Sequence, residues 1–161
     1  MVSNTTHADA WAIVAEVEDP ELPHVTLGDL GIVRDVQTHE RSASVTLTPT
    51  YSGCPATEQI RADVEAALRE GGFEPEVHFA MSPAWTTDWI TDVGRTKLRA
   101  AGIAPPHPTS DDHAALLDLP VECPRCGSRQ TRRISDFGST ACKASYKCNA
   151  CAEPFEHVKA L

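Results

Sequence analysis

Long apolar runs and a basic leader are both lacking in this sequence. No apolar segment approaches the roughly 20 residues that a membrane-spanning helix needs. The residues after Met1 are polar and lack the basic and apolar regions of a secretory signal. We therefore expect a cytoplasmic protein with no membrane partner. In a reducing compartment, clustered cysteines are more typical of metal ligands than of disulfides.

The sequence also lacks the motifs of two common enzyme classes. It contains no Gly-rich phosphate loop and no G-x-S-x-G elbow, which removes the main support for nucleotide hydrolysis and for serine-hydrolase catalysis.

Positive charge is scarce. The chain has 14 Lys and Arg against 23 Asp and Glu, a formal net charge of -9, whereas general nucleic-acid binding depends on clustered cations. A local exception is the basic run of Arg125, Arg129, Arg132 and Arg133. A solvated surface is the commoner explanation for such a run, so the composition argues against nucleic acid as a partner.

Cysteine is nearly absent from the first 120 residues, where Cys54 stands alone, but five cysteines follow between residues 123 and 151. The composition therefore changes near Pro120, after a segment rich in proline and polar residues. We predict an α+β domain over residues 1–103, a Pro-rich polar linker over 104–118 and a zinc ribbon over 119–161.

Hydrophobic periodicity predicts the elements of the first domain. A helix is expected over residues 8–17, with Trp11, Val14 and Val17 repeating on one side, until the two prolines of DPELP end it. Strands are expected over residues 31–36, 44–48 and 76–81.

Two further helices are expected. The first carries Ile60, Val64 and Leu68 at a spacing of four and stops at Gly71-Gly72. The second would begin with Thr87 or Asp88 as its N-cap. Its core candidates are Ile90, Leu98 and Ile103. The order of elements predicts a small helix-covered mixed sheet.

Two C-x2-C pairs mark the tail, Cys123 with Cys126 and Cys148 with Cys151, separated by 21 residues. This separation lies just beyond the usual window for a four-cysteine zinc site. Each pair can nevertheless direct two thiolates at one ion, and two pairs complete the tetrahedron that structural zinc prefers. Residues 130–135 and 144–147 can form a hairpin, and residues 153–158 can add a third strand.

The tail has few large apolar side chains, so metal binding would supply much of its folding free energy. We predict a structural zinc, while iron in the same four-sulfur geometry stays open. The fifth tail cysteine, Cys142, has no obvious partner and is expected to be a small buried residue of the hairpin.

Cys54 is predicted to be the N-cap of the helix that follows it, because Pro55 suits a first helical turn. The helix dipole would favour a thiolate there, able to bind metal or sulfide or to attack an electrophile. Cysteine is equally a common buried residue, and its placement does not decide between the two. A base such as His24 or His78 could approach only in space. Further polar candidates are Thr50, Asp19, Glu21 and Asp29.

The segments DPELPHVTLGDLGIVRDV and TPTYSGCPA resemble the MIP18-like domain of iron–sulfur assembly factors, also called domain of unknown function 59. Asp19-Pro20-Glu21 matches its D-P-E motif, and Thr50 with Cys54 matches its T-x-x-x-C motif. The segments SPAWTTDWI, GIAPP, FGSTACKA and EPFEHVK narrow the resemblance to the D subunits, also called J, of the ring-1,2-phenylacetyl-CoA epoxidase system of aerobic phenylacetate degradation.

The resemblance implies an accessory subunit, not catalytic alone, of a multicomponent monooxygenase whose di-iron centre and reductase lie on other subunits. It would assist assembly or maturation of an iron–sulfur or di-iron centre. Cys54 would be the ligand or acceptor of transient iron or an iron–sulfur cluster, Thr50 its neighbour, and Asp19 and Glu21 polar support. Expected partners are the oxygenase and reductase subunits and iron–sulfur assembly proteins, and a homodimer stays open.

Two alternatives remain open. One is a non-catalytic scaffold that binds the oxygenase complex through the zinc ribbon, with Cys54 only packing. The other is a directly acting oxygenase component or thiol enzyme.

Overall fold

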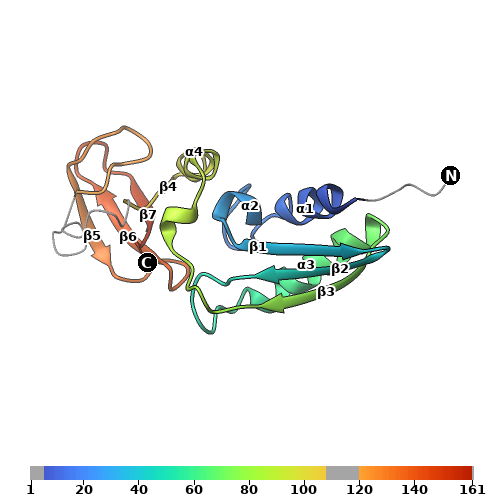
Figure 1. Ribbon diagram of the computed structural model, residues 1–161. Helices are drawn as coiled ribbons and strands as arrows, with labels where there is room; N and C mark the ends of the chain where they lie inside the picture. The colour runs from blue at the N-terminus through green and yellow to red at the C-terminus, as the bar shows by residue number, and fades with distance from the viewer. Residues whose placement is uncertain (1–5, 108–119, 161) are drawn as a thin grey trace. The chain divides into compact units, whose positions relative to one another are not determined.

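Helices and strands both occur along residues 6–107 and 120–160, which are the residues that the computed structural model describes (Figure 1). The chain divides between Trp85 and Thr86 into two compact units. The first contains a three-stranded sheet and the second a four-stranded sheet. The predicted α+β class is therefore confirmed.

The sheet of the first unit has the strand order β1-β2-β3. Its strands are β1 (Val33–His39), β2 (Ser42–Leu47) and β3 (Glu74–Phe79). β1 and β2 form an antiparallel hairpin, whereas β2 and β3 run parallel. A parallel pair needs a crossover, and α3 (Thr57–Glu70) supplies it. The loop between β2 and α3 contains the T-x-x-x-C motif.

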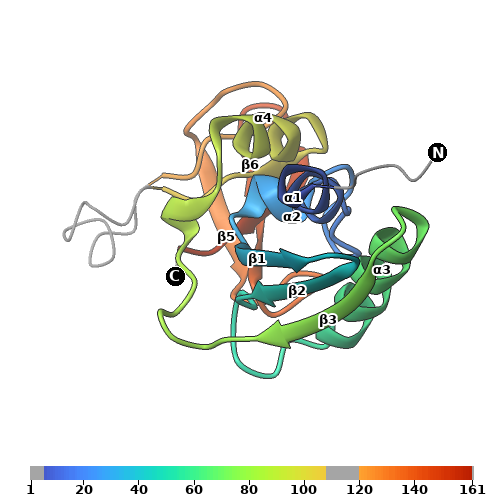
Figure 2. The same cartoon turned by 45° about the vertical axis from the view of Figure 1, so that its right-hand side comes forward.

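Two helices cover one face of this sheet. α1 (His7–Ala15) packs against β1, α3 packs against β3, and the two helices contact each other (Figure 2). Ile60, Val64 and Leu68 of α3 are buried, as their spacing predicted. The single turn α2 (Leu27–Leu30) is capped reciprocally by Thr26 and Asp29.

The predicted core side of the first helix is wrong in part. Ala10 and Val14 are buried, but Trp11 is 38% exposed. Val17 lies beyond the helix, because the chain leaves the helix at the C-cap Glu16. A capping box between Thr6 and Asp9 fixes the start of α1.

The second unit begins with two short helices, the 3-10 turn η1 (Thr87–Trp89) and α4 (Asp92–Ala100). Thr86 caps the first and Thr91 caps the second, so the expectation that Thr87 or Asp88 caps one longer helix is wrong. Extended backbone at Ile90 separates the two helices. The three predicted core residues Ile90, Leu98 and Ile103 are all buried.

The sheet of the second unit has the order β4-β7-β6-β5. Its strands are β4 (Ile103–Ala104), β5 (Thr131–Ser135), β6 (Lys143–Cys148) and β7 (Pro154–Val158). The hairpin β5-β6 and the added strand β7 confirm the ribbon pattern. The short β4, which pairs parallel to β7, was not predicted.

The unit boundary at Trp85/Thr86 lies earlier in the chain than the predicted domain boundary at residue 103. Residues 86–103 belong with the ribbon because β4 pairs with β7 and because Arg95 donates hydrogen bonds to the carbonyls of Thr87 and Pro106. Ala104, the first residue of the predicted linker, is therefore a buried strand residue. Residues 108–118 of that linker lie outside the described residues.

No helix in the described ranges combines the length and the apolar character required to cross a membrane.

Candidate functional site

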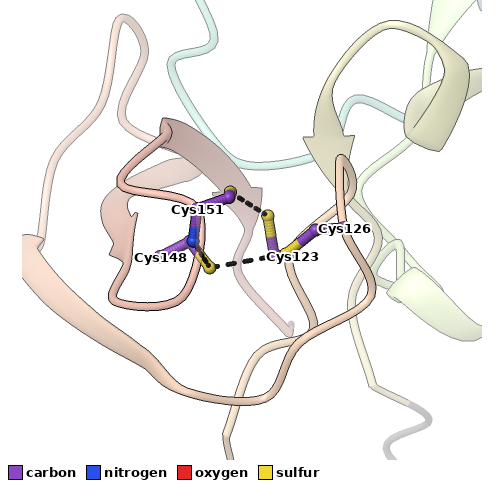
Figure 3. Close-up of side chains that lie close together, drawn as sticks. All are labelled: Cys123, Cys126, Cys148 and Cys151. Atoms are coloured by element: carbon purple, nitrogen blue, oxygen red, sulfur yellow. Dashed lines mark hydrogen bonds between the residues drawn. The ribbon is translucent and has the colours of Figure 1, made fainter.

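The four cysteines of the C-x2-C pairs converge at one end of the β5-β6-β7 sheet (Figure 3). Cys123 and Cys126 precede β5, Cys148 ends β6, and Cys151 lies in the turn before β7. Both turns are tied back by backbone bonds, from Cys123 N–H to the Ser128 carbonyl and from Cys148 N–H to the Glu153 carbonyl. The chain thus presents two knuckles that face each other.

The sulfur positions fit a tetrahedral metal site. All four Sγ atoms lie within 4.8 Å of one another. The Cys123–Cys151 and Cys126–Cys148 separations are 3.8 Å and 3.6 Å. Zinc–sulfur bonds of about 2.3 Å at tetrahedral angles place the sulfurs about 3.8 Å apart. A disulfide would need about 2.05 Å, so these pairs have the spacing of metal ligands.

Backbone geometry favours the thiolate form at one position of this cluster. The Cys151 N–H donates to Cys148 Sγ over 3.5 Å, and this bond is the largest of the interactions that lower the pKa of the Cys148 thiol to about 7. Against a bond from the Ser128 backbone, burial and the neighbouring thiols of the tetrad instead raise the pKa of the Cys126 thiol to about 12. Metal ligation requires deprotonated cysteine, so the second knuckle is prepared for it.

The apolar core of the ribbon is small. Its buried cluster consists of Ala104, Val121, Cys123, Ala144, Tyr146, Cys148 and Phe155. Two members are cysteines of the tetrad and only two are aromatic, so little apolar surface is buried without the ligands. This agrees with a fold that depends on metal binding.

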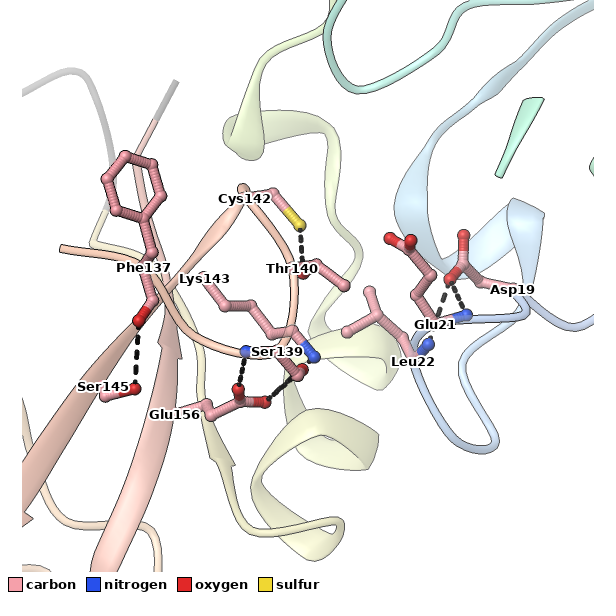
Figure 4. A network of polar contacts seen from close by, with 10 residues as sticks. All are labelled: Asp19, Glu21, Leu22, Phe137, Ser139, Thr140, Cys142, Lys143, Ser145 and Glu156. Atoms are coloured by element: carbon pink, nitrogen blue, oxygen red, sulfur yellow. Dashed lines mark hydrogen bonds and ion pairs between the residues drawn. The ribbon is translucent and has the colours of Figure 1, made fainter. Parts of the chain in front are cut away.

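Cys142 lies outside the tetrad, on the loop between β5 and β6. It is half-buried rather than buried as predicted, and its Sγ lies 3.1 Å from Thr140 Oγ1. The loop is held by Glu156, which accepts from the Ser139 N–H and hydroxyl and pairs with Lys143 Nζ at 2.9 Å (Figure 4).

Lys143 is 3% exposed and the Glu156 side chain is 28% exposed, so the cation of this ion pair is buried and its carboxylate is partly buried. Burial opposes ionisation of Glu156, yet the Ser139 N–H and Lys143 hold the pKa of its carboxyl below the ordinary value. Sequence periodicity offered no signal for this pair, because its members meet only through strand pairing.

The predicted N-cap role of Cys54 is wrong. α3 begins at Thr57 with Ala56 as its N-cap, and no side chain caps it. The Cys54 carbonyl instead accepts from the Thr57 N–H at 3.2 Å and the Thr57 hydroxyl at 2.7 Å. Pro55 and Ala56 therefore form a turn before the helix. Cys54 is half-buried on this loop, so its exposure does not decide between a reactive thiol and a packing residue.

The other motif residues have local roles. Asp19 Oδ1 accepts from the Glu21 and Leu22 N–H groups at 2.8 Å and 3.0 Å, which shapes the D-P-E turn (Figure 4). Thr50 is half-buried in the Cys54 loop. Asp29 is the capping partner of Thr26 at the start of α2.

The described residues contain one group of three or more potential metal ligands, and it is the tail tetrad. Cys54, Asp19 and Glu21 do not form a second such group. Di-iron bundles hold their metals with Glu-x-x-His pairs on helices. Glu21 and His24 have this spacing, but they lie in a turn where His24 has φ of 63°. They therefore do not form such a helical pair.

At the start of the loop that contains Cys54, the buried hydroxyl of Thr48 has no hydrogen-bond partner among the described residues, and the Thr48 side chain is 0% exposed. Nothing in the sequence signalled this, because threonine at a strand end is ordinarily exposed or bonded.

Two family models match separate parts of the chain. The family described as "Iron-sulfur cluster assembly protein" matches residues 7–82. The family described as "PaaD zinc beta ribbon domain" matches residues 107–159. The first contains the D-P-E and T-x-x-x-C motifs, and the second contains the cysteine tetrad.

Two solved structures resemble more than half of the chain. A domain of unknown function DUF59 from Bacillus anthracis is 32% identical, covers 57% of this chain and 90% of its own, and superposes with a TM-score of 0.53. A conserved hypothetical protein from Thermotoga maritima is 29% identical, covers 61% of this chain and 98% of its own, and has a TM-score of 0.51.

Two curated proteins are similar in sequence. An "Fe-S protein maturation auxiliary factor" of Porphyromonas gingivalis is 30% identical over 98 residues, 58% of this chain and 90% of that protein. The putative D subunit of the 1,2-phenylacetyl-CoA epoxidase of Escherichia coli is 46% identical over 156 residues, 95% of this chain and 92% of that protein. With both of its parts matched, the chain belongs to the family of phenylacetyl-CoA epoxidase D subunits, in which an iron–sulfur assembly domain is followed by a zinc ribbon.

Proposed function

We propose that the protein is an accessory subunit of the phenylacetyl-CoA epoxidase system and assists assembly or maturation of the oxygenase's iron–sulfur or di-iron centre. The observation that carries this proposal is Cys54. Its side chain is only half-buried, lies outside the tail tetrad and belongs to the segment that matches the iron–sulfur assembly family. The names of the two curated relatives point to the same combination of epoxidase and maturation.

Cys54 would hold iron or sulfide as cargo rather than as a resident cofactor. It belongs to no group of three or more potential ligands within the described residues, so the remaining ligands would come from a partner or from a second copy of the chain. One accessible sulfur with external co-ligands suits transfer better than storage. Thr50 would act as its neighbour on the loop, while Asp19 and Glu21 maintain the D-P-E turn and offer polar support.

The tail tetrad would hold a structural zinc. Cys123, Cys126, Cys148 and Cys151 fill all four tetrahedral positions, which leaves none for chemistry. Bound zinc would fix the two knuckles and stabilise the ribbon. Partners in this scheme are the oxygenase and reductase subunits and iron–sulfur assembly proteins.

The test compares Cys54→Ser with a matched control, Cys142→Ser, which removes the other half-buried thiol outside the tetrad. Both proteins should fold and contain zinc. In cells, Cys54→Ser should lower the iron content and activity of the oxygenase, whereas the control should not. Anaerobic purification with zinc, iron and sulfide analysis shows whether cargo depends on Cys54. Full iron loading of the oxygenase with Cys54→Ser contradicts the proposal.

A scaffold function is the second candidate, favoured by two large apolar side chains exposed on and just after β5, Ile134 at 54% and Phe137 at 66%. It predicts stoichiometric co-purification with the oxygenase whatever residue stands at position 54. Loss of co-purification in Cys54→Ser would count against it.

A further inference from the structure

Two cations lie directly opposite each other on the ribbon sheet. Arg132 of β5 lies directly opposite Lys147 of β6, and directly opposed residues of antiparallel strands project from the same face at about 5 Å between β-carbons. Within the described part of the chain, neither side chain has a hydrogen bond or an ion pair. Like charges in this arrangement are destabilising, which is unexpected in a chain of net charge -9.

Three other cations of the ribbon are paired with carboxylates. Arg125 binds Glu153 at 3.0 Å and Arg133 binds Asp136 at 2.9 Å. Together with the Lys143–Glu156 pair, these contacts engage three of the ribbon's carboxylates, Glu153, Asp136 and Glu156. The Arg132–Lys147 pair is therefore left positive, although the chain has an excess of acidic residues.

β5, the strand that carries Arg132, is an edge strand of the sheet. It ends the order β4-β7-β6-β5 within the described residues, so the backbone N–H and C=O groups on its outer side do not pair with another strand of this sheet. A register shift between Arg133 and Ser135 makes Ile134 the bulged residue, and it is 54% exposed.

An exposed aromatic ring lies three residues further on. Phe137 is 66% exposed, but its backbone is held on both sides. Its N–H donates to Ser135 Oγ at 3.1 Å. Its carbonyl accepts from Ser145 Oγ at 3.3 Å, the bond drawn in Figure 4. The Lys159 ammonium lies 4.9 Å from the ring centroid. The ring is thus fixed in position on the surface, as expected of a binding contact.

From these features we propose that the β5 edge binds an extended, acidic segment of a partner protein. Carboxylates of that segment would neutralise Arg132 and Lys147, its backbone would pair with the free edge of β5, and an apolar side chain would cover Ile134 and Phe137. The inference deepens the proposed function, because it assigns the surface through which the accessory subunit engages the epoxidase's oxygenase component.

Nucleic acid fits this surface less well. Two unneutralised cations beside an apolar patch do not make the basic stripe that phosphate backbones require, and the net charge of -9 opposes such binding. A purely protective role is the other reading, since charged side chains and bulges also prevent edge strands from pairing. That reading predicts no loss of binding when the charges are reversed.

The test measures binding of the full-length, zinc-loaded protein to the purified oxygenase component by biolayer interferometry. Arg132→Glu/Lys147→Glu should weaken binding by about tenfold or more at low ionic strength, and added salt should reduce the difference. The control Arg99→Glu reverses an exposed cation of the same unit on α4, and should change binding by less than about twofold.

A single substitution separates binding from folding. Arg132→Glu converts the repulsive pair into an attractive one, so the thermal midpoint should rise by about 2 °C while binding weakens. An Arg132→Glu protein with unchanged affinity for the oxygenase overturns the proposal. So does tighter binding of a 20-nucleotide RNA or duplex DNA than of the oxygenase component.

The same samples separate this inference from the proposed function. If charge reversal leaves binding intact but Cys54→Ser still lowers oxygenase iron, only the surface is wrong. If charge reversal abolishes binding but Cys54→Ser loads iron normally, the surface stands and the maturation role fails.

Discussion

His157 should make the ribbon lose stability below neutral pH. The side chain is 7% exposed, its Nδ1 lies 3.2 Å from the Ala104 carbonyl, and its ring meets the edge of Tyr146 at 5.5 Å. Burial lowers the pKa of His157 from 6.5 to about 4, and the charges of His107 and Arg133 act in the same direction, against the opposing Ala104 bond. The folded ribbon is therefore more stable when the His157 ring is neutral than when it is protonated.

The direction and size of the effect follow from linkage. Between pH 6.5 and 4 the unfolded chain binds a proton at His157 that the folded chain does not, so stability rises with pH across this window. The neutral His157 makes its full contribution to the free energy of unfolding above about pH 7. That free energy falls by about 2 kcal/mol at pH 5, and by about 3 kcal/mol once the folded form is protonated, at about 1.36 kcal/mol per pKa unit.

The assay combines two measurements on the zinc-loaded protein. Side-chain NMR of the imidazole nitrogens should show His157 still neutral at pH 5.5. Hydrogen exchange of β6 and β7 amides should show a steeper loss of stability from pH 7 to pH 5 than in His157→Phe, which keeps a ring but cannot be protonated. Titration of His157 near pH 6.5, or equal slopes in the two proteins, would refute the reasoning.

Three further predictions concern single side chains. Cys148→Ala should abolish stoichiometric zinc binding and melt the ribbon sheet in circular dichroism and NMR spectra while the first unit stays folded, because the ribbon's small core cannot offset the lost metal; retained zinc at one equivalent would show that the tetrad is not the site. Thr48→Val should raise the free energy of unfolding by about 1 kcal/mol in urea titrations, since it removes a buried, unpartnered hydroxyl at constant shape; a loss of similar size would mean that the hydroxyl is satisfied in solution. Glu156→Gln should cost about 3 kcal/mol by leaving Lys143 buried without its counter-charge, whereas Glu153→Gln, at an exposed pair, should cost less than about 1 kcal/mol; equal effects in the two variants contradict the buried-pair argument.

The parts of the fold that follow from local spacing were predictable. Ile60, Val64 and Leu68 repeat along one helix, so their burial depends on no distant residue. The same holds for the two knuckles, because a C-x2-C turn places both of its sulfurs by itself. The hairpin between the knuckles follows from their separation and from the alternation of residues in β6.

The parts that depend on distant pairing were not predictable. β4 contains two residues and exists because it pairs with β7, and the Lys143–Glu156 ion pair forms across neighbouring strands. At the candidate site, Cys54 was placed on the correct loop, but its N-cap role failed because Pro55 and Ala56 form a turn that a sequence does not distinguish from a first helical turn. The roles of Cys54, Thr50, Asp19 and Glu21 in handling iron stay predictions.

The pairing of β4 with β7 also has a consequence for the order of synthesis. Ile103 is paired with Glu156, so translation at about 5–20 residues per second separates the two partners by about 3–10 s. The first unit, made entirely from residues 1–85, can fold during that interval. The nascent ribbon meanwhile exposes one edge of β4 and carries only the first pair of the tetrad's thiols, so metal capture and sheet closure should occur together as the last step of folding of the ribbon.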